Sequence, residues 1–330
     1  MQHMLDLFMY ALTTNSILWV GLIFVLGLLV GSFLNVVIHR VPIMLERDWR
    51  TQARQILEDS AEAADGKAGP THRSAHQSAH RPATPADTAP PSPDVYNLAV
   101  PRSACPGCGA LITAWQNIPV VSYLVLKGRC ANCGVKIPPR YPVVEFATAL
   151  LSALVAWKFG VVWYTAAALV LTWSLIALSG IDIDHQLLPD NITLPLMWLG
   201  LLLSLAATIP QAGLPVDPRS SIIGAAAGYL SLWSLFHLFK LLTGKEGMGY
   251  GDFKLFAALG AWLGWQMLLL IILLSAFTGA LVGIAMIALR GRDKNIPIPF
   301  GPYLAAAGWI ALMWGHELIG SYLRISGIGT

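Results

Sequence analysis

The chain has 330 residues, of which 55% are hydrophobic and 12% are charged, and its net charge is +3. Soluble domains carry about 25% charged residues, so this composition excludes an ordinary soluble globular protein. The mean hydropathy of +0.61 agrees with that exclusion. We therefore expect a polytopic membrane protein.

Apolar segments recur along most of the chain. A helix that spans the ~30 Å hydrocarbon core of a bilayer needs about 20 predominantly apolar residues. The predicted fold is therefore all-α, with about eight transmembrane helices, of which the sixth is short. The predicted segments are residues 17–38, 143–159, 161–180, 192–209, 222–242, 254–264, 266–290 and 301–320.

The distribution of Lys and Arg predicts the orientation of the chain. No Lys or Arg precedes the first segment, whereas residues 40–142 hold twelve. With the N-terminus outside, eight spans place eighteen of the 21 Lys and Arg residues on the cytoplasmic side, as the positive-inside rule requires. The first segment lacks a basic leading region and a small-residue cleavage pattern, so we expect a retained anchor and not a signal peptide.

The first cytoplasmic loop has two parts of different composition. Residues 51–97 are rich in Ala, Pro, Ser, His and Asp, with few large apolar side chains. Such a segment buries too little surface to offset its ordering entropy, so we expect a flexible polar insert. His72, His76 and His80 recur every four residues within it. If this segment were helical, the three histidines would share one face and could bind a metal. We favour the interpretation of a polar linker over that of a metal site.

The second part of this loop carries all four cysteines. Cys105 and Cys108 form one Cys-x-x-Cys pair, and Cys130 and Cys133 form the other. Four thiolates satisfy tetrahedral zinc completely and leave no open position, which is typical of a structural site. We therefore expect a zinc-ribbon-like unit, with a redox pair as the secondary interpretation. The predicted divisions are a first helix at 1–40, a cytoplasmic linker at 41–97, the zinc unit at 98–142 and a membrane-embedded core at 143–330.

Two acidic stretches stand at the edges of apolar segments, on the predicted cytoplasmic face. One runs from Asp182 through Asp184 to Asp190, and the other is Gly249-Tyr-Gly-Asp252. Singly, each acid would more often cap a helix or pair with Lys254 or Lys245. Together, two neighbouring carboxyl groups can share a proton and act as acid and base on a peptide bond. A proton or ion pathway is the alternative for acids near a membrane.

The ordered motifs of the chain resemble the type IV prepilin peptidase family. The resemblance runs through nearly the whole chain, and the residues 51–97 insert is the departure from the family pattern. The matching motifs are Gly31-Ser-Phe-Leu-Asn-Val-Val-Ile-His-Arg40-Val-Pro42, the paired cysteines, Asn117-Ile-Pro-Val-Val-Ser-Tyr123, Arg140-Tyr-Pro-Val-Val-Glu145, the Asp182–Asp190 stretch, Gly249-Tyr-Gly-Asp252 and Pro299-Phe-Gly-Pro302.

This resemblance implies an aspartic endopeptidase with Asp182 and Asp252 as its catalytic acids. Asp184 and Asp190 remain alternatives to Asp182. The family removes a short basic leader from type IV prepilins and type II secretion pseudopilins, and then methylates the new N-terminal amine with S-adenosylmethionine. The implied location is the bacterial inner membrane, with a periplasmic N-terminus and cleavage at the cytoplasmic face. The expected partners are these substrates and the lipid bilayer, and no nucleic acid.

The site of methyl transfer is not readable from the sequence. No Gly-x-Gly-x-x-Gly follows a predicted strand, so no dinucleotide-type fold is indicated. Asn117 and Glu145 are candidates by position only, while Gly31 and Asn35 suit close packing within the first helix. One alternative function is a peptidase that acts on pseudopilins only and lacks methyl transfer. The other is a zinc-stabilised proton-coupled transporter that uses the aspartates as a relay. Because a transporter of this kind often carries internal repeats and none stands out here, that alternative is weak.

Overall fold

The computed structural model describes residues 14–65, 96–206, 216–245, 247–290 and 298–327. Within these residues the regular structure is helical, apart from two isolated antiparallel bridges in the cysteine region. Each of the eight apolar segments predicted from the sequence overlaps one long helix. These helices are α2 (Ser16–Asp65), α4 (Arg140–Phe159), α5 (Trp163–His185), α6 (Asp190–Ala206), α7 (Pro218–Thr243), α8 (Tyr250–Leu263), α9 (Leu268–Arg290) and α10 (Gly301–Ile325).

Five stretches of helix are long and apolar enough to cross a membrane, and α6 is a shorter apolar helix. The protein is therefore a multi-pass membrane protein. The five candidate spans are Ser16–Ser60, Arg140–Phe159, Trp163–His185, Pro218–Thr243 and Trp265–Met286.

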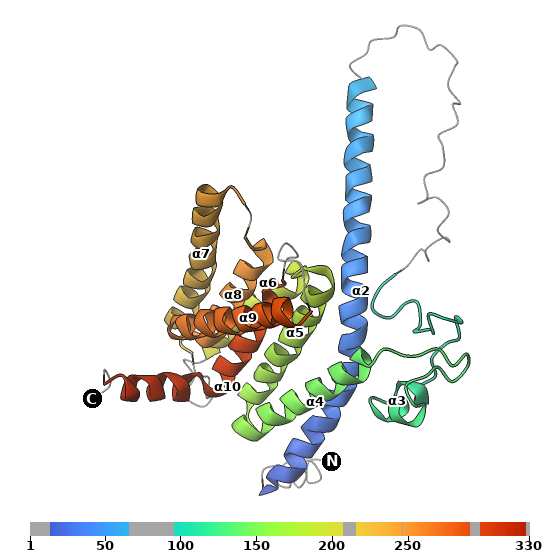
Figure 1. Ribbon diagram of the computed structural model, residues 1–330, viewed down its shortest axis with the longest axis horizontal. Helices are drawn as coiled ribbons and strands as arrows, with labels where there is room; N and C mark the ends of the chain where they lie inside the picture. Colours follow the sequence, from blue (N-terminus) through green and yellow to red (C-terminus); the bar gives the residue numbers. More distant parts are fainter. Residues whose placement is uncertain (1–13, 66–95, 207–215, 246, 291–297, 328–330) are drawn as a thin grey trace.

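Helix α2 is much longer than the sequence predicted. It continues through Pro42 to Asp65 and rises well beyond the remaining helices (Figure 1). The prediction of a flexible insert is therefore wrong for residues 51–65, whereas residues 66–95, with all three histidines, lie outside the described residues. From residue 43 to 65 the chain has no Gly or Pro and many good helix formers, which explains the continuation. An ion pair between Glu46 and Arg50, one turn apart, adds local support.

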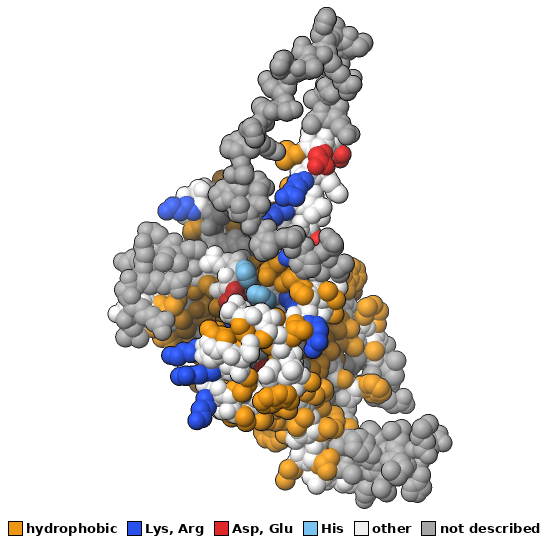
Figure 2. Space-filling model, turned by 90° about the vertical axis from the view of Figure 1, so that its right-hand side faces the viewer, with side chains coloured by type: hydrophobic (Ala, Val, Ile, Leu, Met, Phe, Trp, Pro, Cys, Tyr) orange, Lys and Arg blue, Asp and Glu red, His pale blue; other side chains and the backbone are white. Residues whose placement is uncertain are grey.

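The surface changes character along α2. Figure 2 shows hydrophobic side chains over much of the body, whereas the extension of α2 carries acidic and basic side chains. Large exposed hydrophobic residues also occur on α7 and α9, such as Leu230, Leu238 and Leu281. Exposed apolar side chains on long helices are expected where lipid replaces water as the surrounding solvent.

Helix α8 lies at the centre of the packing. It contacts α6, α7, α9 and α10, and every residue from Leu255 to Leu263 is buried. Gly224 of α7 and Gly260 of α8 allow the two backbones to touch, since a methyl group on either glycine would collide with the carbonyl group of the other. Such small-residue contacts let membrane helices pack closely. Helix α10 contacts α5, α8 and α9, and α2 contacts α4 and α5.

Helix α7 has a well-formed start. Asp217 precedes it in an extended conformation, and its Oδ1 accepts hydrogen bonds from the backbone amides of Arg219 and Ser220 at 3.0 and 3.1 Å. Pro218 occupies the first helical turn, where its missing amide proton costs nothing. This cap and the proline together determine where α7 begins.

Candidate active site and metal centre

Asp182 lies in the last turn of α5, and its side chain is almost completely buried, with only 5% of the residue exposed. The helix ends because Gln186 adopts a left-handed conformation, with φ of 51°, and its amide donates to the Asp182 carbonyl at 2.9 Å. The carboxylate oxygen Oδ2 accepts a hydrogen bond of 3.0 Å from the backbone amide of Gly301, at the start of α10. The first turn of a helix carries partial positive charge, so this amide suits a carboxylate.

Asp252 lies in the first turn of α8, and 7% of the residue is exposed. The two carboxyl groups are close enough for their charges to interact. Leu188 lies between Gly251, which precedes Asp252, and Gly301, which donates to Asp182. A methyl group on Gly251 would come within 2.7 Å of Leu188 Cβ, and one on Gly301 within 3.2 Å of Leu188 Cδ1. The ends of α5, α8 and α10 therefore meet around these two aspartates.

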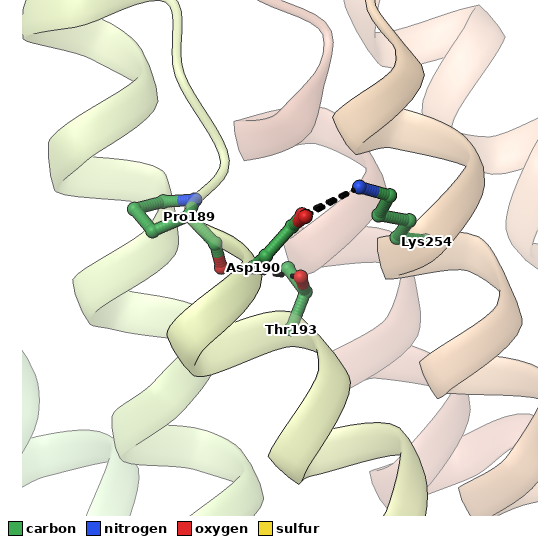
Figure 3. A network of polar contacts seen from close by, with 4 residues as sticks. All are labelled: Pro189, Asp190, Thr193 and Lys254. Atoms are coloured by element: carbon green, nitrogen blue, oxygen red, sulfur yellow. Dashed lines mark hydrogen bonds and ion pairs between the residues drawn. The ribbon is translucent and has the colours of Figure 1, made fainter. Parts of the chain in front are cut away.

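The other two aspartates of the first acidic stretch have cationic partners. Asp184 forms an ion pair with Arg140 at the start of α4. Asp190 accepts two hydrogen bonds from Lys254 Nζ, at 2.6 and 2.7 Å, which join the starts of α6 and α8 (Figure 3). In the same view Thr193 Oγ1 donates to the Pro189 carbonyl at 3.1 Å. Asp184 and Asp190 thus have contacts typical of structural acids.

Asp182 and Asp252 differ from this pattern. Within the described ranges neither forms an ion pair with Lys, Arg or His. Two buried carboxyl groups that interact without a cation favour a state in which one holds a proton and the other is charged. Such a pair can activate a water molecule with one carboxylate and protonate an oxygen or nitrogen atom with the other.

The four cysteines gather into one cluster. Their sulfur atoms all lie within 4.8 Å of one another, and Cys105 Sγ is 3.8 Å from Cys133 Sγ. A tetrahedral zinc ion with Zn–S bonds of about 2.3 Å would hold its sulfurs about 3.8 Å apart. The chemistry and spacing of this donor set therefore fit zinc.

The two Cys-x-x-Cys turns have the same backbone design. The Cys105 amide donates to the Ala110 carbonyl and the Cys130 amide to the Val135 carbonyl, both at 2.9 Å. In each turn a glycine with φ near +70°, Gly109 or Gly134, follows the second cysteine, a conformation that other residues rarely adopt. The backbone amide of Cys133 lowers the pKa of the Cys130 thiol to about 6, whereas burial and the neighbouring cysteine side chains raise the pKa of Cys133 to about 11. Cys130 therefore supplies most readily the thiolate that a metal requires.

Arg40 attaches the start of the cysteine unit to α2. Its guanidinium is buried and donates to the carbonyls of Asn97 and Pro101 at 2.8 and 2.6 Å. The ring of Tyr96 lies under Arg40 and Arg47, with guanidinium-to-centroid distances of 5.6 and 4.1 Å. The unit is therefore fastened at the same end of the bundle as the α4 start.

Glu145 and Asn117, the two candidates for methyl transfer, and Gly31 and Asn35 of α2 have contacts around α4 and the cysteine unit. Glu145 Oε2 accepts a hydrogen bond of 2.8 Å from the Val120 amide, which links α4 to the cysteine unit. Asn35 Nδ2 donates to the Tyr141 carbonyl at 3.1 Å, and a methyl group on Gly31 would come within 2.7 Å of Glu145 Cα. The backbone amide of Asn117 donates to the Ala114 carbonyl at 3.2 Å. These contacts give Glu145, Asn35 and Gly31 structural roles.

Sequence reasoning missed two contributions to the site. Gly301 appeared only as part of the Pro299–Pro302 motif, without its contact to Asp182, and Arg140 appeared without its pairing to Asp184. A glycine at the start of an apolar segment was the available signal for Gly301. Neither contact joins residues that are close in the sequence, so only the packing of α4, α5 and α10 brings them together.

The fold and the site together define a class: a helical multi-pass membrane protein with two buried, interacting aspartates and a four-cysteine cluster. Comparison with family models extends this description. Residues 25–159 match the bacterial peptidase A24 N-terminal domain, and residues 169–284 match the type IV leader peptidase family.

Curated relatives resemble the chain over nearly its whole length. A prepilin leader peptidase/N-methyltransferase of Stutzerimonas stutzeri is 50% identical over 96% of this chain and 97% of its own length. Proteins of the same name from Pseudomonas aeruginosa and Aeromonas hydrophila are 51% and 52% identical, over 96% and 93% of this chain and 97% and 94% of their own lengths. No solved structure matches the chain. The chain belongs to the type IV leader peptidase family.

Proposed function

We propose that this protein is a membrane aspartic endopeptidase that removes the basic leader of type IV prepilins and type II secretion pseudopilins. The observation that carries the proposal is the identity of 50–52% to proteins named prepilin leader peptidase/N-methyltransferase. The enzyme then methylates the new N-terminal amine, with S-adenosylmethionine supplying the methyl group. The family membership favours this function over the transporter.

Asp182 and Asp252 act as the catalytic pair in this proposal. One carboxylate takes a proton from the attacking water, while the other carboxyl group donates a proton to the carbonyl oxygen of the scissile bond. The first carboxyl group then gives its proton to the leaving amine, the second takes a proton back from a hydroxyl group of the tetrahedral intermediate, and the C–N bond breaks. Their burial and mutual interaction support this assignment, as do the cations that neutralise Asp184 and Asp190.

Zinc has a structural role in the proposal. Cys105, Cys108, Cys130 and Cys133 hold one Zn²⁺ ion in a closed site, which stabilises the loop between α2 and α4. Because all four positions would be taken by thiolates, the metal has no open position for substrate. The mutual spacing of the sulfurs supports this ligand set.

We propose the bacterial inner membrane as the location, with eight spans and a periplasmic N-terminus. The distribution of Lys and Arg supports this orientation. The start of α4, the end of α5 and the cysteine unit then share the cytoplasmic face, since Arg140 pairs with Asp184 and directly follows the unit. The basic leader would be cut at that face.

The test is an assay of the purified full chain with a prepilin in phospholipid vesicles. Mass spectrometry of the product reads both activities in one experiment. Loss of the leader and a gain of one methyl group at the new N-terminus, dependent on S-adenosylmethionine, are expected. An uncut prepilin would contradict the peptidase proposal, and a cut but unmethylated product would contradict the transferase proposal alone.

A further inference from the structure

The cysteine unit carries an apolar patch on its surface. The patch centres on α3 (Val121–Val125), a helix of five residues between the two Cys-x-x-Cys turns. Four hydrophobic side chains, which are 46–67% exposed, make up this α3 patch: Ile118, Val121, Leu124 and Val125. The last three share one face of the helix. Clustered apolar side chains on the surface of a polar unit mark a contact with a partner or with a membrane.

The polar groups of the same segment are paired or turned inward. Ser122 and Tyr123 are only partly exposed, and the Tyr123 hydroxyl donates to the Ile137 carbonyl at 3.4 Å. The backbone amides of Ser122, Leu124 and Leu126 each donate to the carbonyl four residues earlier, at 2.9–3.1 Å. A segment in contact with lipid must satisfy its backbone polar groups internally, and these hydrogen bonds do so.

The position of α3 along α2 places the patch at the depth of the membrane. The amide of Val120, immediately before α3, donates to Glu145 Oε2 at 2.8 Å, and a methyl group on Gly31 would come within 2.7 Å of Glu145 Cα. Val120 therefore lies beside α2 near the level of Gly31. The first Lys, Arg, Asp or Glu residue of α2 is Arg40, which is about 14 Å further along the helix axis than Gly31.

The surroundings of the patch are apolar as well. In Figure 1, α3 lies beside the lower part of α2, level with α4, and far from the extension of α2. Both helices expose large hydrophobic side chains within two residues of Gly31 and Glu145, namely Leu29, Phe33, Val143 and Phe146. The lipid that covers α2 and α4 at this level therefore also reaches α3.

The charge of the cysteine unit fits an anionic membrane surface. From residue 96 to 144 the chain has five Lys and Arg residues and no Asp or Glu. All five are exposed: Arg102, Lys127, Arg129, Lys136 and Arg140. A zinc ion with four thiolates would carry a charge of about −2, so the unit stays positive with its metal bound. Anionic lipids of the cytoplasmic leaflet attract basic segments of this kind.

We propose that the α3 patch is embedded in the lipid leaflet on the side where α4 begins, which is the cytoplasmic leaflet in the proposed orientation. The four side chains of the patch contact acyl chains. Lys127 and Arg129, which follow α3, extend to the phosphates of anionic headgroups, as long basic side chains do at an interface. The cysteine unit is then a membrane-docked module and not a domain surrounded by water. This inference does not depend on either proposed enzymatic activity.

Fluorescence quenching measures the depth of the patch in the full chain. An environment-sensitive fluorescent amino acid replaces Leu124, Leu29 or Leu57, and each protein is reconstituted in vesicles of phosphatidylethanolamine and phosphatidylglycerol. These leucines are 67%, 58% and 70% exposed. Leu29 lies in the apolar part of α2 and Leu57 in its polar extension, so they are matched controls for lipid and for water. A lipid with a nitroxide on its acyl chain quenches probes in the bilayer, whereas iodide quenches probes in water.

We expect the probe at position 124 to lose most of its fluorescence to the nitroxide lipid and to resist iodide, as at position 29. The probe at position 57 should show the reverse. Iodide quenching at position 124 as strong as at position 57 would overturn the proposal. Protection from both quenchers would also overturn it, because the patch would then be covered by protein, such as a second copy of the chain.

Photo-crosslinking gives a second readout with a smaller side chain. A diazirine amino acid in place of Val125 should form adducts with phospholipid in the same vesicles, which mass spectrometry detects. The same amino acid at position 57 should form none. Adducts of position 125 with protein alone would contradict a lipid contact.

Discussion

The backbone amide of Gly301 donates a hydrogen bond of 3.0 Å to Asp182 Oδ2, although the two residues are 119 positions apart in the chain. This contact joins the end of α5 to the start of α10 and orients one of the two buried acids. It also leaves no room for a larger residue, since a methyl group on Gly301 would lie 2.6 Å from the same oxygen atom.

Gly301→Ala should therefore reduce prepilin cleavage by about 100-fold, because a displacement of about 1 Å within a catalytic site has an effect of that order. Gly320→Ala is the control on the same helix, since an added methyl group there meets nothing within 4 Å. Cleavage rates of both variants in vesicles check the expectation. Equal activity of the two variants would show that the Gly301 contact does not orient Asp182.

The backbone contact between Gly224 and Gly260 predicts a stability effect. Gly224→Ala should lower the free energy of unfolding by about 1–3 kcal/mol, the usual cost of overpacking, because α7 and α8 must separate. Gly21→Ala is the control, as an added methyl group on that residue of α2 meets nothing within 4 Å. Thermal unfolding in detergent measures both. A Tm for Gly224→Ala at or above that of the control contradicts close packing of the two helices.

The cysteine cluster predicts one zinc ion per chain. Cys105→Ser should remove the metal while the membrane helices remain, because the unit is connected to the core mainly through Arg40 and Glu145. Elemental analysis of the purified protein measures the zinc, and circular dichroism measures the helices. Thr113→Ala, in the same unit, should keep the metal. Full zinc occupancy in Cys105→Ser would argue against a four-thiolate site.

Asp217 predicts a pH dependence at the start of α7. The backbone amide of Ser220 donates to this carboxylate and lowers its pKa in the folded protein. A lowered folded pKa contributes stability that is present above the unfolded value of about 3.9, and that is lost as the pH falls through the folded pKa. Asp217→Asn keeps the cap without the titration. Its Tm should be below that of the unaltered chain at neutral pH, and the difference should shrink as the pH falls below about 3.9, so a constant difference would contradict this cause.

Much of the helical core was predictable because hydrophobic segments of membrane length are a strong signal. Each of the eight predicted segments overlaps a helix, and the largest difference is at α2. There the prediction weighed the polar composition of residues 51–65 and neglected their helix propensity and the absence of Gly and Pro. Polar composition excludes burial of a segment, but it does not exclude an exposed helix.

The site was predictable only in part. The four cysteines gather as their spacing indicated, because two Cys-x-x-Cys turns form locally and need only one long-range contact. The partners of the aspartates were not predictable in the same way. Lys254 was one of two lysines expected to pair with an aspartate, but the sequence did not assign it to Asp190. It also did not pair Arg140 with Asp184, because these residues are far apart in the sequence and meet only through helix packing.

We propose above that Asp182 and Asp252 form the catalytic pair. The most direct measurement is prepilin cleavage by Asp182→Asn, Asp252→Asn, Asp184→Asn and Asp190→Asn, purified in parallel. Asparagine keeps the shape of the side chain and removes its titrating group. We expect cleavage to be abolished in the first two variants and retained in the last two, whose acids are paired with Arg140 and Lys254. Loss in Asp184→Asn with retention in Asp182→Asn would move the first acid by two residues, and full cleavage by all four variants would contradict the aspartic mechanism.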